Sequence, residues 1–275
     1  MNTPFKNILA AMFIVASASV SYAQEVSIVQ VMSEAPEVSN VQAISTAQEI
    51  SKSLKPFRKI IVSPRVNLIL EKGDHEGVRL VYDNVTPDKI NIEVNRNTLR
   101  IYLDDAKVTE RSELVSTHPT QKRSIYHDVT ITAYVTYRDI EHLEVRGNQE
   151  VTCNSPILAE RFTLKAYGEN DLNFASIKAD YLRTSLYGGN HLHIKGGKAE
   201  FQKYKLFGEN KIDAQALKSY SAIANSFGES RLRLATEDNL KVNAFGESEI
   251  EYTGDASVNK GLIFGETQIH KIVMN

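Results

Sequence analysis

Apolar and polar residues alternate along most of this chain with the two-residue period of β-strands. The alternation begins near Phe57 and predicts five strands, separated by Gly, Asp and Asn turns, at residues 59–62, 65–70, 77–82, 89–94 and 98–103. It resumes at residues 127–135 and 140–145. Between these two groups, residues 104–124 are charged and rich in Ser and Thr, and we predict a long surface loop there. The pattern therefore indicates an all-β protein.

From residue 146 onward, a glycine recurs at nearly constant intervals within this alternation. Seven glycines lie 21, 20, 20, 20, 18 and 19 residues apart: Gly147, Gly168, Gly188, Gly208, Gly228, Gly246 and Gly265. A period of about 20 residues is typical of a solenoid, whose units bury apolar faces against their neighbours. We predict a right-handed parallel β-helix, since crossovers between parallel strands are nearly always right-handed. Residues 57–145 would form its N-terminal β region and residues 146–275 its C-terminal repeats.

Each repeat carries similar residues around its glycine. The preceding residue is aromatic in six copies: Tyr167, Tyr187, Phe207, Phe227, Phe245 and Phe264. A short polar residue follows the glycine: Asn148, Asn170, Asn190, Asn210, Ser230, Ser248 and Thr267. In stacked coils the aromatic rings should bury area and contact one another, while the polar side chains should bond along the stack. The glycines should adopt positive φ in a tight turn.

Five copies place a glutamate between the glycine and the polar residue. We call these residues the Glu column: Glu169, Glu209, Glu229, Glu247 and Glu266. Stacked carboxylates repel, so they must splay into solvent, pair with basic side chains or share a cation. We favour a solvated edge that discourages the addition of further strands; a stripe that binds a cation or a surface is the alternative. The repeats lack the Asp-rich loop of dedicated calcium repeats, so no metal site is predicted.

The first 23 residues have the features of a secretory signal peptide. Lys6 precedes an uncharged apolar run at residues 8–20, and Ser21-Tyr22-Ala23 provides small residues for cleavage before Gln24. The alternative is an uncleaved anchor, although the run is shorter than the about 20 residues of a membrane span. No other stretch could span a bilayer.

Residues 24–56 form a leader without aromatic residues. Its apolar residues recur every three or four positions at Val41, Ile44, Ala47, Ile50 and Leu54, which predicts a helix. This helix would cap the open end of the solenoid, or the segment would serve as a tether.

Composition and isolated motifs limit the partners and the catalytic or metal sites that this chain can have. A net charge of -2, or -3 without Lys6, argues against nucleic acid as a partner. The single cysteine, Cys153, excludes an intramolecular disulfide and is expected to be buried. His191 and His193 lack nearby ligands and make a poor zinc site. No nucleophile elbow or phosphate-binding loop is present, so we predict no catalytic residue and no cofactor.

The tandem Tyr/Phe-Gly-Glu/Gly-Asn/Ser units, together with the alternating residues 57–145 and the export signal, resemble the auto-transporter adhesin head family, the GIN-domain group. The resemblance covers roughly residues 57–270. It implies a right-handed parallel β-helix and an extracytoplasmic location, and it brings no catalytic residues. Many relatives look like lipoproteins, whereas Gln24 replaces the Cys that lipoprotein processing needs.

These observations predict an exported, non-catalytic binding or structural module of the cell envelope that is adhesin-like. It would lie in the periplasm, at the outer membrane or outside the cell, and an envelope glycan or protein would be its partner. The alternative is a polysaccharide-active lyase or hydrolase, because parallel β-helices also host such enzymes, which work with acidic groups on an outer strand face. Such an enzyme needs unlike charged residues in one groove, whereas the repeats show one residue type along an edge. The oligomeric state is left open.

Overall fold

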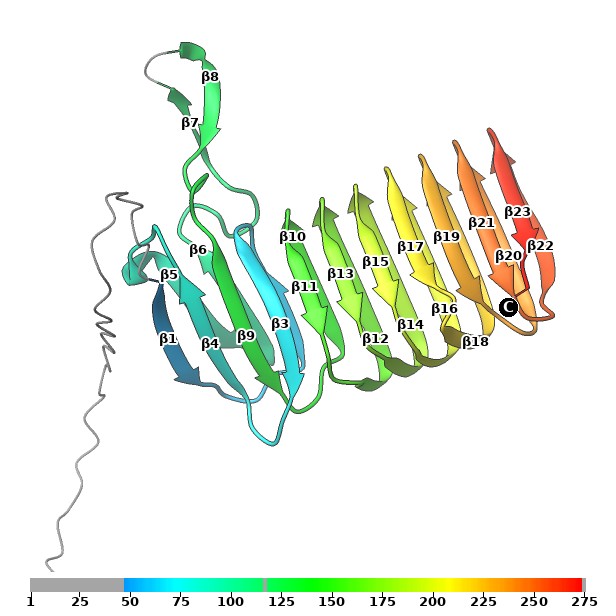
Figure 1. The fold of residues 1–275 in the computed structure, drawn as a ribbon, viewed down its shortest axis with the longest axis horizontal. Helices are drawn as coiled ribbons and strands as arrows, with labels where there is room; N and C mark the ends of the chain where they lie inside the picture. The colour runs from blue at the N-terminus through cyan, green and yellow to red at the C-terminus, as the bar shows by residue number, and fades with distance from the viewer. Residues whose placement is uncertain (1–46, 116–117, 274–275) are drawn as a thin grey trace, which may run out of the picture. The chain divides into compact units, whose positions relative to one another are not determined.

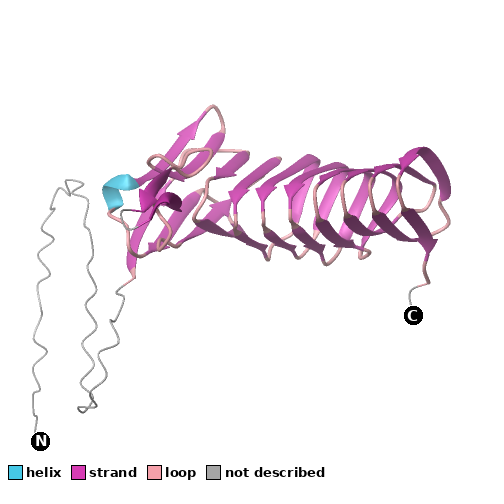
Figure 2. Ribbon diagram, turned by 90° about the horizontal axis from the view of Figure 1, so that it is seen from above, coloured by secondary structure: helices cyan, strands magenta, loops and turns pink. Residues whose placement is uncertain are grey.

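The computed structural model describes residues 47–115 and 118–273, which consist mainly of β-strands (Figure 1). Two large sheets face each other around one core (Figure 2). Sheet A contains, in spatial order, β1 (Gln48–Ser53), β4 (Gly77–Tyr82), β9 (Ile131–Tyr137), β3 (Val66–Lys72), β11 (Glu150–Cys153), β13 (Asp171–Phe174), β15 (His191–Ile194), β17 (Asn210–Ala214), β19 (Ser230–Ala235), β21 (Ser248–Thr253) and β23 (Thr267–Lys271).

Sheet B has ten strands. In spatial order they are β22 (Ser257–Phe264), β20 (Asn239–Phe245), β18 (Leu217–Phe227), β16 (Gly197–Phe207), β14 (Ile177–Gly188), β12 (Ile157–Gly168), β10 (His142–Gly147), β2 (Lys59–Val62), β6 (Thr98–Leu103) and β5 (Ile90–Asn95). A single 3-10 turn, Pro87–Lys89, precedes β5. Among the described residues, no helix has the length and apolar character needed to cross a membrane.

In the C-terminal coils, each coil contributes one strand to each sheet and the chain turns at the repeat glycine. The strands pair parallel and in register, so that Gly147 pairs with Gly168 and Gly168 with Gly188. All seven glycines have positive φ, between 95° and 115°. A Cβ atom at Gly188 would lie 2.3 Å from the carbonyl oxygen of Gly168, so only glycine allows the coils to approach this closely. The solenoid and its glycine turns are therefore confirmed.

The interior of the coils is lined by equivalent residues stacked on one another. On sheet A the buried column is aliphatic: Leu172, Leu192, Ile212, Leu232 and Ile250. The facing positions of sheet B include several small residues, among them Ala166, Ala224, Ser226 and Ala244. The period-two alternation in the sequence therefore predicted correctly which residues point into the core and which point outward, because alternate residues of a strand face opposite sides of the sheet.

The N-terminal β region shares the same core but has a mixed topology. β4 lies antiparallel between β1 and β9, and β5 pairs antiparallel with β6. β3 nevertheless continues the parallel stack by pairing with both β9 and β11. The predicted strands at residues 59–62, 77–82 and 98–103 coincide with β2, β4 and β6.

Two expectations for non-repeat segments are wrong. The leader helix is replaced over Gln48–Ser53 by strand β1, which pairs antiparallel with β4. This pairing satisfies the backbone groups of β4 that would otherwise form an open sheet edge, and Ile50 and Leu54 pack against the core. Residues 1–46, including the predicted signal peptide and the start of the leader, lie outside the described residues.

The second correction concerns residues 104–124, which we expected to form a loop. Within this segment β7 (Ser112–Val115) and β8 (His118–Ser124) form an antiparallel hairpin, with Ser112 opposite Ser124 (Figure 1). The charged composition gave no sign of the hairpin, because a two-stranded ribbon whose described side chains are nearly all exposed shows little apolar alternation.

Candidate binding surface

A ladder of asparagines fixes the turns beneath the Glu column. The Asn170 side-chain amide donates to Asn190 Oδ1 at 2.8 Å, and the Asn190 amide donates to Asn210 Oδ1 at 3.1 Å. All three side chains are buried. The ladder begins at Gln149, whose backbone N–H donates to Asn170 Oδ1 at 3.1 Å.

Our assignment of Asn148 to this ladder is wrong. Because Gly147 pairs with Gly168 and Glu150 with Asp171, Gln149 is opposite Asn170 and Asn148 is opposite Glu169. Asn148 is exposed, whereas Gln149 is buried. The first coil therefore has an amide where later coils carry a carboxylate.

The six aromatic residues before the glycines form a continuous stack on the outer face of sheet B. Neighbouring ring centroids lie 4.8 to 5.1 Å apart, and the first four pairs are tilted by at most 6°. Each interior ring covers the faces of its neighbours, so the stack presents ring edges to solvent. The rings are half-buried, except for the exposed Phe264 at the end of the stack. The stack thus stabilises the corner and leaves few ring faces open for a sugar.

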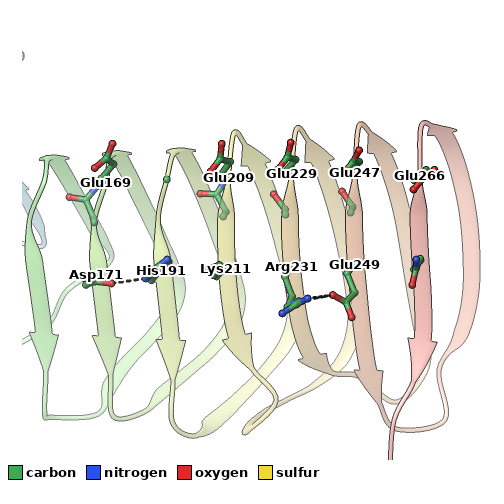
Figure 3. A pocket seen from close by; sticks show the side chains of 16 residues that line it. Glu169, Asp171, His191, Glu209, Lys211, Glu229, Arg231, Glu247, Glu249 and Glu266 are labelled. Carbon is green, nitrogen blue, oxygen red and sulfur yellow. Dashed lines mark hydrogen bonds and ion pairs between the residues drawn. The ribbon is translucent and has the colours of Figure 1, made fainter.

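The Glu column lies along the turn between the two sheets. All five carboxylates are exposed, and Figure 3 shows them in line near the starts of the sheet A strands. Gly189 interrupts the column between Glu169 and Glu209. Among the described residues, none of the five carboxylates takes part in an ion pair. Because the carboxylates are exposed to water of high dielectric, the repulsion between their like charges is weak.

A second row, three residues after each glycine, runs along the outer face of sheet A beside the Glu column. Its members carry mixed charge: Asp171, His191, Lys211, Arg231, Glu249 and Gln268. His191 Nδ1 lies 3.1 Å from Asp171 Oδ1, and Arg231 Nε donates to Glu249 at 2.6 Å (Figure 3). Lys211, between these pairs, has no ion-pair partner among the described residues. The sequence analysis missed this row because its residue type changes from coil to coil, although its distance from each glycine is constant.

Together the Glu column and this second row line one open groove of about 840 Å³, which we call the sheet A groove. A smaller hollow of about 350 Å³ adjoins it and is lined in part by His193, Asp213 and Arg233. In the described part of the chain, no three His, Cys, Asp or Glu side chains converge to hold a metal ion. The groove offers both hydrogen-bond donors and acceptors on a rigid sheet, an arrangement suited to an extended polar ligand.

A buried carboxylate with two basic neighbours lies on sheet B, away from the groove. Glu144 is only 7% exposed. His142 Nε2 lies 3.6 Å from its carboxylate and Arg146 Nε donates to it at 2.9 Å. The nearby His142 ring, together with the hydrogen-bonded Arg146, outweighs burial and lowers the pKa of Glu144 to about 2. The Arg146 guanidinium also lies 5.3 Å from the centroid of Tyr167, the first ring of the aromatic stack.

Cys153 is buried, as expected from its sequence context. Burial raises the pKa of its thiol, and Sγ lies 3.5 Å from the Tyr137 hydroxyl. A buried thiol with a raised pKa is a poor nucleophile. Cys153 is therefore a core residue.

The fold and the groove define a class: a parallel β-solenoid with an open polar groove along one side. More specifically, the chain belongs to the family described as "Putative auto-transporter adhesin, head GIN domain", whose model matches residues 56–256. This confirms the resemblance seen in the sequence. No curated protein matches the chain.

Solved structures with the same fold come from Bacteroides and Parabacteroides species. A putative adhesin from Bacteroides fragilis aligns with a TM-score of 0.65 and 17% identity over 85% of this chain and 100% of that one. A putative adhesin from Parabacteroides merdae gives a TM-score of 0.56 and 17% identity over 82% and 96% of the two chains. A putative lipid binding protein from Parabacteroides distasonis gives 0.56 and 18% over 83% and 98%. At these identities the likeness shows the fold alone.

Proposed function

We propose that this protein is an exported, non-catalytic adhesin-like module of the cell envelope, which binds an extended glycan or polypeptide along the sheet A groove. The family supports an adhesin-like binding role. Its place of action would be the periplasm, the outer membrane or the cell exterior, as the predicted signal peptide suggests. The observation that carries the proposal is Lys211 at the centre of the groove, which has no ion-pair partner in the part of the chain that the structure describes.

The groove is preorganised for binding because its side chains stand on strands rather than on loops. Neighbouring coils are about 4.8 Å apart, so His191, Lys211 and Arg231 present three basic groups at a regular spacing. Carboxylates from the Glu column lie along the same groove and supply acceptors. An extended ligand would thus meet both donors and acceptors without ordering a flexible loop, which reduces the entropic cost of binding.

An enzyme would require a different arrangement. A glycosidase uses two carboxyl groups that flank the scissile bond, one of them protonated through a raised pKa. In the groove the Glu column is exposed, and Glu249 is engaged by Arg231. These features favour binding over turnover.

The proposal is tested by measuring the binding of the purified mature chain to arrays of neutral, amino and acidic glycans and of unstructured peptides. We expect Lys211→Ala with Arg231→Ala to weaken binding of a retained ligand about tenfold or more. Lys52→Ala, an exposed lysine on β1, is the control and should leave the affinity unchanged. Equal binding by the groove variant, or cleavage of a bound glycan, would overturn the proposal.

A further inference from the structure

The outer face of sheet B carries a block of positive charge, which we call the basic face. Three outward-pointing rows run across β12, β14, β16, β18 and β20. The first row consists of Arg161, Tyr181, Phe201, Ser221 and Asn239. The second consists of Thr163, Arg183, Lys203, Ile223 and Lys241. The third consists of Lys165, Ser185, Lys205, Asn225 and Asn243. These positions include six cations, Arg161, Lys165, Arg183, Lys203, Lys205 and Lys241, and no acid.

Nothing within the described chain neutralises these cations by direct contact. None of the six forms an ion pair with a described residue. Arg183 instead lies over the Tyr181 ring, 5.7 Å from its centroid. The nearest acid on the adjoining strand β10, Glu144, is opposite Lys165 but is engaged by His142 and Arg146. Exposed carboxylates of Glu160, Asp180 and Glu200 lie beside the first row on the same strands, and Glu200 pairs with Lys198. The six cations of the basic face thus keep no direct ion-pair partner among the described residues, although the whole chain has a net charge of -2.

Protection of a sheet edge does not explain this block. Lysines that prevent strand addition stand on edge strands, whereas β14 and β16 are central strands with partners on both sides. Arg183 and Lys203 are directly opposite each other on these strands, and like charges in that position are destabilising. An external anion would relieve this repulsion.

The layout of the cations indicates the shape of that anion. Along the axis of the coil stack, charges recur after one or two coils, about 5 or 10 Å apart, as in Arg183, Lys203 and Lys241. A linear chain lying along this axis would meet them in succession. Asn225 and Asn243 lie between and beside them. Asn243 Nδ2 donates to Asn225 Oδ1 at 2.9 Å, and both amides also bond the backbone, at the Tyr204 carbonyl and the Leu262 N–H, so they are held in place beside the cations.

A membrane surface fits less well. Peripheral membrane binding combines basic groups with large apolar side chains that enter the acyl boundary. The large apolar residues in the three rows are Tyr181, Phe201 and Ile223; all three are half-buried, and the two rings stack on each other with centroids 4.9 Å apart. We propose that the basic face binds a linear acidic polysaccharide, carboxylated or sulfated, independently of the sheet A groove.

The test uses the folded mature chain with alginate and heparin as carboxylated and sulfated probes, and dextran as the neutral probe. We expect both acidic chains, but not dextran, to bind, with an affinity that falls steeply with salt. The variant Arg183→Gln/Lys203→Gln/Lys205→Gln should lose about tenfold or more in affinity.

The control variant removes three lysines from the same sheet at a different place; one of them, Lys198, pairs with Glu200 at 3.1 Å. Lys178, Lys198 and Lys218 form a column near the start of the strands, on β14, β16 and β18. Lys178→Gln/Lys198→Gln/Lys218→Gln should reduce the affinity by no more than about twofold. Equal losses in the two triple variants would overturn the proposal, because they would indicate general charge attraction.

Two further measurements test whether another class of ligand, or the sheet A groove, accounts for the binding. Tighter binding to vesicles containing phosphatidylglycerol, or equally tight binding to duplex DNA, would also overturn the proposal. The groove variant Lys211→Ala/Arg231→Ala should bind alginate and heparin normally; loss of binding there would assign the polyanion to the groove instead. Unchanged thermal melts would show that each variant is folded.

Discussion

The N-terminal β region and the C-terminal coils share one core but are stabilised in different ways. Around β4 and β9, parallel and antiparallel strands meet and a buried side chain contacts residues of different types and sizes. In the coils, each residue lies on its own equivalent from the previous coil, as Leu172 lies beside Leu192 and Tyr187 beside Phe207.

Because of this difference, the two regions are sensitive to different kinds of substitution. A three-dimensional core of large aliphatic residues is weakened most by a cavity. A stack of equivalent residues is weakened most by a change that prevents close approach of one coil to the next, since each coil depends on its neighbours. Substitutions in the two regions should therefore lower the stability of the protein for different reasons.

The largest effect is expected from a cavity in the N-terminal region. Leu80 on β4 is fully buried, and Leu80→Ala should reduce the free energy of unfolding by about 4 kcal/mol. Val81, its outward-pointing neighbour, is half-buried, and Val81→Ala should cost less than about 1 kcal/mol. Urea denaturation would measure both. Equal losses would show that the two faces of β4 are assigned wrongly.

The next effect concerns the approach of one coil to another. Gly188→Ala should cost about 3 kcal/mol, because it combines a strained positive φ with a backbone clash. At Gly77, in the N-terminal region, the nearest atom to an added Cβ is the Lys52 carbonyl oxygen at 3.7 Å. Gly77→Ala should be nearly neutral. Thermal melts that ranked the two variants equally would remove the distinction between the regions.

A smaller, pH-dependent effect is expected where the two regions join. Glu144 lies on β10, which pairs with β2 on one side and β12 on the other. Its pKa of about 2 in the folded protein is below the about 4.3 of an unfolded glutamate. Its contribution to stability is thus fully present above pH 5 and is lost as the pH falls toward 2.

Glu144→Gln should therefore cost about 2 kcal/mol at pH 7 and almost nothing at pH 2. Denaturant unfolding across this pH range would measure the loss. Glu141→Gln is the control, because Glu141 pairs with Arg58 on the exposed surface and such pairs contribute at most about 1 kcal/mol. A loss in Glu144→Gln that did not change with pH would show that the carboxylate charge is not responsible.

The smallest effect is expected at the Glu column. Glu209→Gln/Glu229→Gln/Glu247→Gln should leave stability unchanged or raise it by up to about 0.5 kcal/mol, since repulsion between exposed carboxylates is relieved. Melts with and without calcium would measure this. If the column binds a cation, the triple variant should instead lose stability only when calcium is present. Glu249→Gln, which breaks the pair with Arg231, should lower stability slightly under both conditions.

Sequence alone predicted the coils because each residue's neighbour is another copy of the same position. The glycine spacing therefore gave the register directly, and with it the stacked aromatic residues. The asparagine ladder was misassigned at Asn148 because residue type was followed there instead of distance from the glycine, which selects Gln149.

The N-terminal β region was less predictable because its strands pair with unrelated segments. β1 is a strand because β4 offers it an open edge, and this contact is absent from the local spacing of Ile50 and Leu54. The mixed-charge row through Lys211 was within reach of the sequence, since it keeps a constant distance from each glycine. Its role could only be seen once the coils placed Lys211 between His191 and Arg231 in one groove.

The direction of the hydrogen bonds between coils has a mechanical consequence. Backbone hydrogen bonds in both sheets link one coil to the next and so run along the axis of the stack. Tension applied along that axis at one corner would open a coil–coil boundary a few bonds at a time, like a zipper. A pull along the strands would instead load all the bonds of a boundary together, in shear. If a ligand bound on the side of the stack is pulled along the strands, the force therefore acts in the direction in which this scaffold is strongest.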